Sequence, residues 1–303
     1  MSAFQFRPDE SVRHAVHRIA RHEIETMLAE LKVGPRGRTA VHEARKSSKK
    51  LRALVRLVRD GIGEKTYRSE NTTLRDAVRP LSPVRDAEAL LHILDVITEH
   101  FAGEVRARMF DHLRKTLQTR LRAIRAAPST RAAMRRSAAL VARVRSHLAK
   151  VAIRDGGWQA LGPGLRRIYA RARAAKRQVD DDPNVEHLHE WRKRSKDLRY
   201  ALELLEPIWP PVVKAFADEG HALTDRLGDD QDLARLEQVI HAEPASCGTP
   251  EDRAALLGLI DVRRDELQAE ARSLGERIYR EKPRAFITRH RGYWRAWREP
   301  RNA

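Results

Sequence analysis

The sequence predicts an all-α protein made of two homologous four-helix-type bundles. Apolar residues recur with helical periodicity along nearly all of the 303 residues, and no convincing period-2 strand pattern appears. Aromatic residues make up only 5% of the chain, and glycine and proline are few, which favours helices rich in alanine, leucine and arginine. A long internal repeat predicts that these helices form two similar bundles within one domain.

The first half of the chain is expected to form six helices. Asp9 after Pro8 and Thr39 are suitable residues for starting the first two of them. The stretch "RDGGWQALGPG" (154–164) contains four glycines and a proline, which predicts a break before the second half. The expected helices span residues 9–31, 39–60, 64–79, 84–100, 103–126 and 129–152.

The second half is expected to form six more helices. Asp182-Pro183 precedes the second of them, and Gly228 separates the third from the fourth. Their ranges are 164–179, 184–206, 209–227, 229–241, 250–281 and 284–297.

The repeat is clearest in two basic segments, "HEARKSSKKLRALVRLVR" starting at His42 and "HEWRKRSKDLRYALELLE" starting at His189. The order of the neighbouring helices also repeats, and "LSPVRDAEALL" (81–91) resembles "LGDDQDLARLE" (227–237). We therefore expect an N-terminal bundle over residues 1–155 and a C-terminal bundle over 160–300, related by an internal pseudo-twofold axis.

On a helix, the basic residues of each segment share one face, an arc of roughly 120° in the first copy. We name these faces the first basic stripe and the second basic stripe. The first consists of His42, Arg45, Lys46, Lys49, Arg52 and Arg56, and the second of His189, Arg192, Lys193, Lys196, Arg199 and Tyr200. Solvated faces normally mix charge signs, so a nearly unbroken cationic stripe written twice favours a polyanion held between the stripes in a basic central groove or pore. An ordinary solvated face is the alternative interpretation.

The helices upstream of the stripes supply further candidates. Arg166, Arg173 and Arg177 share a face with Tyr169 in the second half, and Arg13, His17 and Arg21 are their counterparts in the first half. For these two helices a solvated face is the favoured interpretation.

The formal net charge of +18 favours polyanionic partners, namely nucleic acid, an anionic membrane surface or a phosphate polymer. The single cysteine, Cys247, excludes an intrachain disulfide and favours a reducing compartment. No signal-peptide pattern opens the sequence, and no run of about 18 apolar residues is present, so we expect a cytoplasmic protein with no membrane insertion.

The paired basic segments resemble the conserved histidine α-helical domain, the CHAD family. Its motif is a helix that begins His-(Asp/Glu)-x-x-(Arg/Lys) and continues with spaced Lys and Arg, once in each half. "VHEARKSSKKLRALVRLV" and "LHEWRKRSKDLRYALELLEP" both fit, and the resemblance covers nearly all of residues 1–303. It implies a fold of two four-helix bundles with internal twofold pseudosymmetry, and it implies inorganic polyphosphate as the ligand and polyphosphate granules as the location.

The resemblance also implies which residues bind. They are the members of the two basic stripes, with Arg85 as a further candidate. Arg85 has Gln231 in its place in the second half, which departs from the repeat. Some family members are fused to a CYTH-type triphosphate-hydrolysing domain, whose Glu-x-Glu-x-Lys motif is absent here. We therefore expect a stand-alone binding protein that is not an enzyme.

Other chemistry is weakly indicated. His187 and His189 point about 160° apart on a helix, so no metal site is expected, and no cofactor-binding fingerprint occurs. Asp229 and Asp230 are interpreted as stabilising acids at a helix N-terminus, and Asp86 and Asp232 as structural partners of the basic stripes. Divalent cations carried in with the polymer are a possible additional partner.

Nucleic acid, with RNA preferred over DNA, is the alternative ligand. Sparse aromatic residues on the stripes argue against it. The C-terminal "RHRGYWRAWREPRNA" mixes arginine with Tyr293, Trp294 and Trp297, and packing on the second bundle is favoured over base stacking for these rings.

Overall fold

The computed structural model describes residues 2–34, 39–106, 108–154 and 156–299. Within these ranges every regular element is helical, and the only β-type pairing is an isolated bridge between Ala102 and Val105. The predicted all-α fold class is confirmed.

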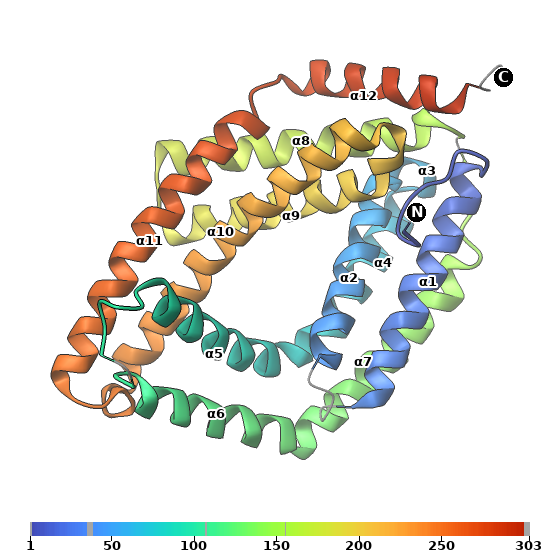
Figure 1. Cartoon of the computed structure of the whole chain (residues 1–303). Helices are drawn as coiled ribbons and strands as arrows, with labels where there is room; N and C mark the ends of the chain where they lie inside the picture. The colour runs from blue at the N-terminus through green and yellow to red at the C-terminus, as the bar shows by residue number, and fades with distance from the viewer. Residues whose placement is uncertain (1, 35–38, 107, 155, 300–303) are drawn as a thin grey trace.

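The helices follow one another with short connections (Figure 1). In the first half they are α1 Val12–Val33, α2 Ala40–Leu57, α3 Arg59–Ile62, α4 Glu64–Val78, the 3₁₀ turn η1 Arg79–Leu81, α5 Ser82–His100, α6 Asp111–Ala126 and α7 Pro128–Leu148. In the second half they are α8 Trp158–Asp181, α9 Val185–Leu205, η2 Glu206–Ile208, α10 Pro210–Ala242, η3 Pro244–Cys247, α11 Pro250–Ile278 and α12 Pro283–Arg298.

One predicted break at glycine is wrong, and another is shorter than expected. The chain does break between α7 and α8, but α8 already begins at Trp158. Helix α10 runs unbroken through Gly228. A Cβ at Gly164 would lie 1.9 Å from the carbonyl oxygen of Leu57, so this glycine lets α8 approach the backbone of α2. A Cβ at Gly228 would lie 3.1 Å from an Arg192 nitrogen. Both glycines serve close packing rather than chain reversal.

Three helix starts also differ from expectation. Ser11, not Asp9, caps α1 by accepting a hydrogen bond from the His14 backbone, and Asn184 caps α9 in the same way. The helix expected from residue 103 begins at Asp111, after turns that include Arg108 with φ of 70°. The first turn of each helix therefore depends on local capping that apolar periodicity does not specify.

The helices are arranged around the middle of the molecule (Figure 1). Helices α1, α2, α4 and α7 pack together, and α8, α9 and α10 pack together with α11 and α12 at their edges. Helices α5 and α6, from the first half, pack against α10 and α11 of the second and build a separate apolar core with them. The division at residues 155 and 160 and the pseudo-twofold axis stay predictions.

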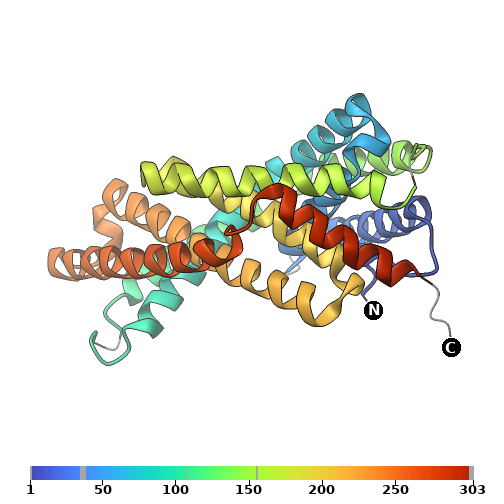
Figure 2. The same ribbon diagram turned by 90° about the horizontal axis from the view of Figure 1, so that it is seen from above.

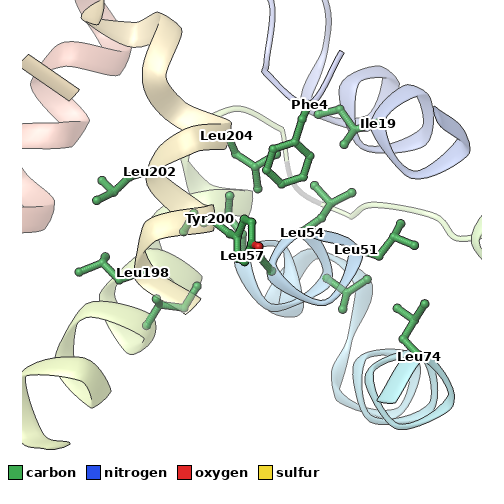
Figure 3. Packing of buried hydrophobic residues seen from close by; sticks show 14 of the residues in the cluster. Phe4, Ile19, Leu51, Leu54, Leu57, Leu74, Leu198, Tyr200, Leu202 and Leu204 are labelled. Carbon is green, nitrogen blue, oxygen red and sulfur yellow. The ribbon is translucent and has the colours of Figure 1, made fainter. Parts of the chain in front are cut away.

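The main core joins the two halves directly, because α2 packs against α9 (Figure 3). Leu54 and Leu57 of α2 are fully buried, as is Leu204 of α9. Tyr200 lies between these helices with its ring edge-on to Phe4, 6.4 Å between centroids. Packing the apolar sides of α2 and α9 together brings their basic faces into the same region of the molecule.

Candidate functional site

A cavity of about 550 Å³ lies between α2, α5, α9 and α10. Nine of the predicted residues line it: His42, Arg45, Lys46, Lys49, Arg85, Arg192, Lys196, Arg199 and Tyr200. The other described lining residues are Glu88, Ala89, His92, His221, Thr224, Asp225, Gly228, Asp229 and Asp232. We name this space the basic cavity, since both basic stripes contribute to it.

Two arginines, one from each stripe, are held in place by the neighbouring helix. Arg45 donates to the carbonyl oxygen of Val78 at 2.9 Å and to Ser82 Oγ at 3.2 Å. Arg192 donates to Gln231 Oε1 at 2.8 Å. The Nε atoms of both arginines are buried without an acceptor among the described residues. The protein therefore orients these guanidinium groups with neutral hydrogen-bond acceptors, while Asp86 near Arg45 and Asp232 near Arg192 favour their charged forms without a direct hydrogen bond.

Lys49 and Lys196 are the most unusual residues of the cavity. Both are half-buried, and neither makes a hydrogen bond or an ion pair with the described part of the chain. Burial, reinforced by nearby arginines, lowers the pKa of Lys49 to about 7 and that of Lys196 to about 6. The two amines are close enough for each to disfavour the charged form of the other.

Arginine–carboxylate pairs join α5 to α10 at the edge of the cavity. Arg85 donates to both oxygens of Asp232, at 3.2 and 3.0 Å, and Arg235 donates to Asp86 at 3.1 Å. The direct hydrogen bonds of these aspartates therefore go to Arg85 and Arg235, while their charges also favour the charged forms of the stripe residues Arg45 and Arg192. These ion pairs fix the two helices that face the stripes.

An acidic and imidazole wall faces the stripes, and the sequence analysis missed it. Asp225 pairs with His221 at 2.7 Å, and Glu88 accepts from Arg125 at 2.6 Å. Burial, reinforced by Asp225, raises the pKa of Asp229. The four-residue spacing of His221, Asp225 and Asp229 is the signal that could have placed them on one helix face.

Asp229 and Asp230 are not at a helix N-terminus, as was expected, because α10 is continuous there. Asp230 points away from the cavity: it is buried and accepts hydrogen bonds from Arg264 at 3.2 Å and Gln268 at 2.9 Å. The two neighbouring acids therefore have different roles, one at the cavity and one in the contact with α11.

Four members of the basic stripes do not line the basic cavity. Arg56 donates to Asp197 at 2.6 Å, and Arg52 donates to the side chain of Asn71 at 3.1 Å. Lys193 is exposed and pairs with Glu190 at 2.6 Å. His189 lies beside Gln231 with its Nδ1 buried, and burial lowers its pKa.

The upstream candidates also lie elsewhere. Arg13, His17 and Arg21 line a separate pocket of about 460 Å³ along α1, where His17 Nε2 is 3.0 Å from the Val151 carbonyl oxygen. Arg173 and Arg177 line a pocket of about 170 Å³ between α8 and α11, and Arg173 donates to the Tyr279 carbonyl oxygen at 3.0 Å. Arg166, on α8, lines a groove between α8 and α12.

The electrostatic balance of the basic cavity favours anions. Seven Lys and Arg residues and four Asp and Glu residues line it, so its formal charge is +3 with histidine neutral and with Lys49 and Lys196 counted as charged. Burial lowers the pKa of His42, so this histidine is mostly neutral near pH 7. Across the described ranges, no group of three or more His, Cys, Asp or Glu side chains is arranged to hold a metal ion. None of the helices described is both long enough and apolar enough to cross a membrane.

Comparison with known proteins agrees with the sequence resemblance. A family model for the CHAD domain matches residues 11–241. Two uncharacterized proteins of Mycobacterium tuberculosis, one from each of two strains, are 26% identical over 280 residues, which is 87% of this chain and 53% of theirs. The chain thus spans about half the length of these curated relatives. Among solved structures, PptA from Streptomyces chartreusis superposes with a TM-score of 0.58 at 16% identity, covering 86% of this chain and 96% of that one. At this identity the similarity shows a shared fold.

Proposed function

This chain belongs to the CHAD domain family, and on that premise we propose that it binds inorganic polyphosphate in the basic cavity. One observation carries the proposal: Lys49 and Lys196, from the two copies of the repeated helix, line one cavity with no carboxylate paired to either among the described residues. A polymer with a negative charge on every unit would supply the missing counter-charges to both.

The surrounding groups suit phosphate oxygens. Arginine guanidinium groups such as those of Arg45 and Arg192 can donate two hydrogen bonds to one phosphate, while lysine acts as a compact point charge. Tyr200 is the one aromatic residue among the described lining residues, so the cavity offers little for stacking bases. The polymer we propose has no bases to recognise.

We propose a binding role without catalysis. Three of the four carboxylates that line the cavity are engaged in ion pairs, in which Glu88, Asp225 and Asp232 have Arg or His partners. They stabilise the walls of the cavity instead of gathering around a catalytic ion. Divalent cations would enter with the polymer, and the protein would associate with polyphosphate granules in the cytoplasm.

The test is a salt titration of binding to long-chain polyphosphate, with transfer RNA and duplex DNA measured in parallel. We expect polyphosphate binding to persist at salt concentrations that abolish nucleic-acid binding, because enclosed charge pairs are screened less than surface ones. Equal affinities with equal salt slopes for all three polymers would contradict the proposal.

Charge-reversal variants test whether polyphosphate binds in the basic cavity. Lys49→Glu combined with Lys196→Glu should weaken polyphosphate binding at least about a hundredfold, since it places two like charges against the polymer. The matched control is Lys65→Glu with Lys115→Glu, which makes the same change in formal net charge at two exposed positions outside the cavity and outside the basic stripes. Equal losses in the two double variants would mean that only net charge matters. Circular dichroism confirms that each variant keeps its helices.

A further inference from the structure

A second large groove lies between α8 and α12, well away from the basic cavity. Its volume is about 820 Å³, within the range typical of small-molecule sites. Helix α12 runs along α8 at the edge of the molecule (Figures 1 and 2), and it follows the part of the chain matched by the family model. The α8 wall of this groove therefore lies within the matched segment, and the α12 wall lies outside it.

Two tryptophans form an aromatic surface in the groove. The rings of Trp158 and Trp294 are 6.1 Å apart with an interplanar angle of 46°. Trp294 is buried at 4% exposure and packs edge-on to Phe6, which confirms that this ring packs against the protein. Trp158 is half-buried and keeps part of its indole exposed. It lies against α8 at Gly162, where a Cβ would come within 2.5 Å of its Nε1.

Arginines surround this aromatic surface without acidic neighbours. Among the described residues that line the groove, four are arginine and none is Asp or Glu. Arg167 pairs with Asp60, but Arg166, Arg291 and Arg295 are exposed and make no side-chain hydrogen bond or ion pair with the described chain. Three uncompensated guanidinium groups beside an indole can take phosphate oxygens and a planar ring at the same time.

We propose that the α8–α12 groove binds a nucleoside phosphate, with its base on Trp158 and its phosphates on Arg166, Arg291 and Arg295. A bare phosphate chain would leave the indole and the apolar side chains of the groove, such as Ile287, without a partner. A base uses them, because stacking on an aromatic side chain contributes about 1–3 kcal/mol per base. A free nucleotide and one unit of a single-stranded nucleic acid share this chemistry.

The experiment is calorimetric titration of the full chain with ATP, inorganic tripolyphosphate and a short single-stranded oligoadenylate. With the basic cavity disabled by Lys49→Glu and Lys196→Glu, we expect ATP to bind more tightly than tripolyphosphate. Adding Trp158→Leu should weaken ATP binding by about tenfold, as expected for the loss of one stacked base. Arg291→Gln with Arg295→Gln should weaken both ATP and oligoadenylate binding by a similar factor. The matched control is Arg284→Gln, an exposed arginine of α12 that does not line the groove.

The outcomes distinguish a free nucleotide from a single-stranded nucleic acid as the ligand, and the α8–α12 groove from the basic cavity as the site. Oligoadenylate binding that depends on Trp158 and the two arginines, without ATP binding, would assign the groove to a strand. ATP and tripolyphosphate binding equally when the basic cavity is disabled, or ATP affinity unchanged by both Trp158→Leu and the arginine pair, would overturn the proposal. Lys49→Glu with Lys196→Glu should leave the part of ATP binding that depends on Trp158 intact, so failure here is distinguishable from failure of the polyphosphate site.

Discussion

Polyphosphate binding in the basic cavity should draw protons from solution. Before binding, Lys49 with a pKa of about 7 and Lys196 with a pKa of about 6 are mostly neutral at pH 8. A polyanion between them favours the charged form of both amines and returns their pKa values toward the ordinary 10.5. The expected uptake is the neutral fraction of each amine before binding, about 0.9 and 1.0, which totals about 1.9 protons at pH 8. At pH 6 the same calculation gives about 0.1 and 0.5, a total of about 0.6.

Titration calorimetry measures this uptake directly. The apparent binding enthalpy is recorded in two buffers of equal pH and ionic strength but different ionisation enthalpies, and the slope between them gives the number of protons. Lys49→Met with Lys196→Met is the control, since it removes both amines and should remove the uptake assigned to them. An uptake near zero in the wild type at pH 8, or the same uptake in the control, would refute the idea that these lysines are neutral before binding.

The remaining predictions concern stability, first at the same two lysines and then at a close contact between two helices. Lys49→Met with Lys196→Met should raise the ligand-free free energy of unfolding by about 1–4 kcal/mol, because it replaces two half-buried amines that have no carboxylate partner with apolar groups of similar size. A lower melting temperature would contradict this. In the wild type, these two lysines bind more protons in the unfolded chain than in the folded one at pH values between their lowered pKa values and the ordinary 10.5. The stability of the wild type should therefore rise with pH from about 6 to 10. The double variant should show a flatter dependence of melting temperature on pH. Gly164→Ala should destabilise the protein by about 1–3 kcal/mol, because its Cβ would lie 1.9 Å from the Leu57 carbonyl oxygen. The control is Gly258→Ala on an open helix surface, which should stabilise the protein by about 0.5–1 kcal/mol. Denaturant unfolding measures both variants. If both change the stability alike, the contact between α8 and α2 is not tight.

The sequence predicted the fold class and the central residues of the basic cavity, because helical periodicity and a repeat are local properties. A helical-wheel projection shows which residues share a face, but it does not show how far apart they lie along the helix axis. Arg56 and Lys49 share a face, but they are seven residues apart, which is about 10.5 Å of helix. Arg56 consequently reaches Asp197, on the side of α9 away from the cavity lysines, and Arg52 reaches Asn71. A helical wheel therefore cannot show that residues on one face contact different neighbours along the helix.

The acidic wall was missed for a different reason. Its position depends on the continuity of α10 through Gly228, and a glycine beside two aspartates is normally a sign of a helix boundary. Gly228 is used instead to make room for Arg192, a contact between two helices that no local pattern encodes. The groove between α8 and α12 was hidden in the same way, since Gly162 and Trp158 lay in the stretch expected to be a break.

Lys176 shows how this chain treats a lysine whose role is structural. It is 5% exposed, and it donates to Asp180 at 2.7 Å and also pairs with Glu276. Burial disfavours its charged form, but the two carboxylates outweigh that effect and raise its pKa. Lys49 and Lys196 receive no such partners among the described residues, and their pKa values fall instead. This chain therefore compensates a buried structural lysine with two carboxylates but leaves the two half-buried cavity lysines without one among the described residues, which supports our proposal that they bind an anionic ligand.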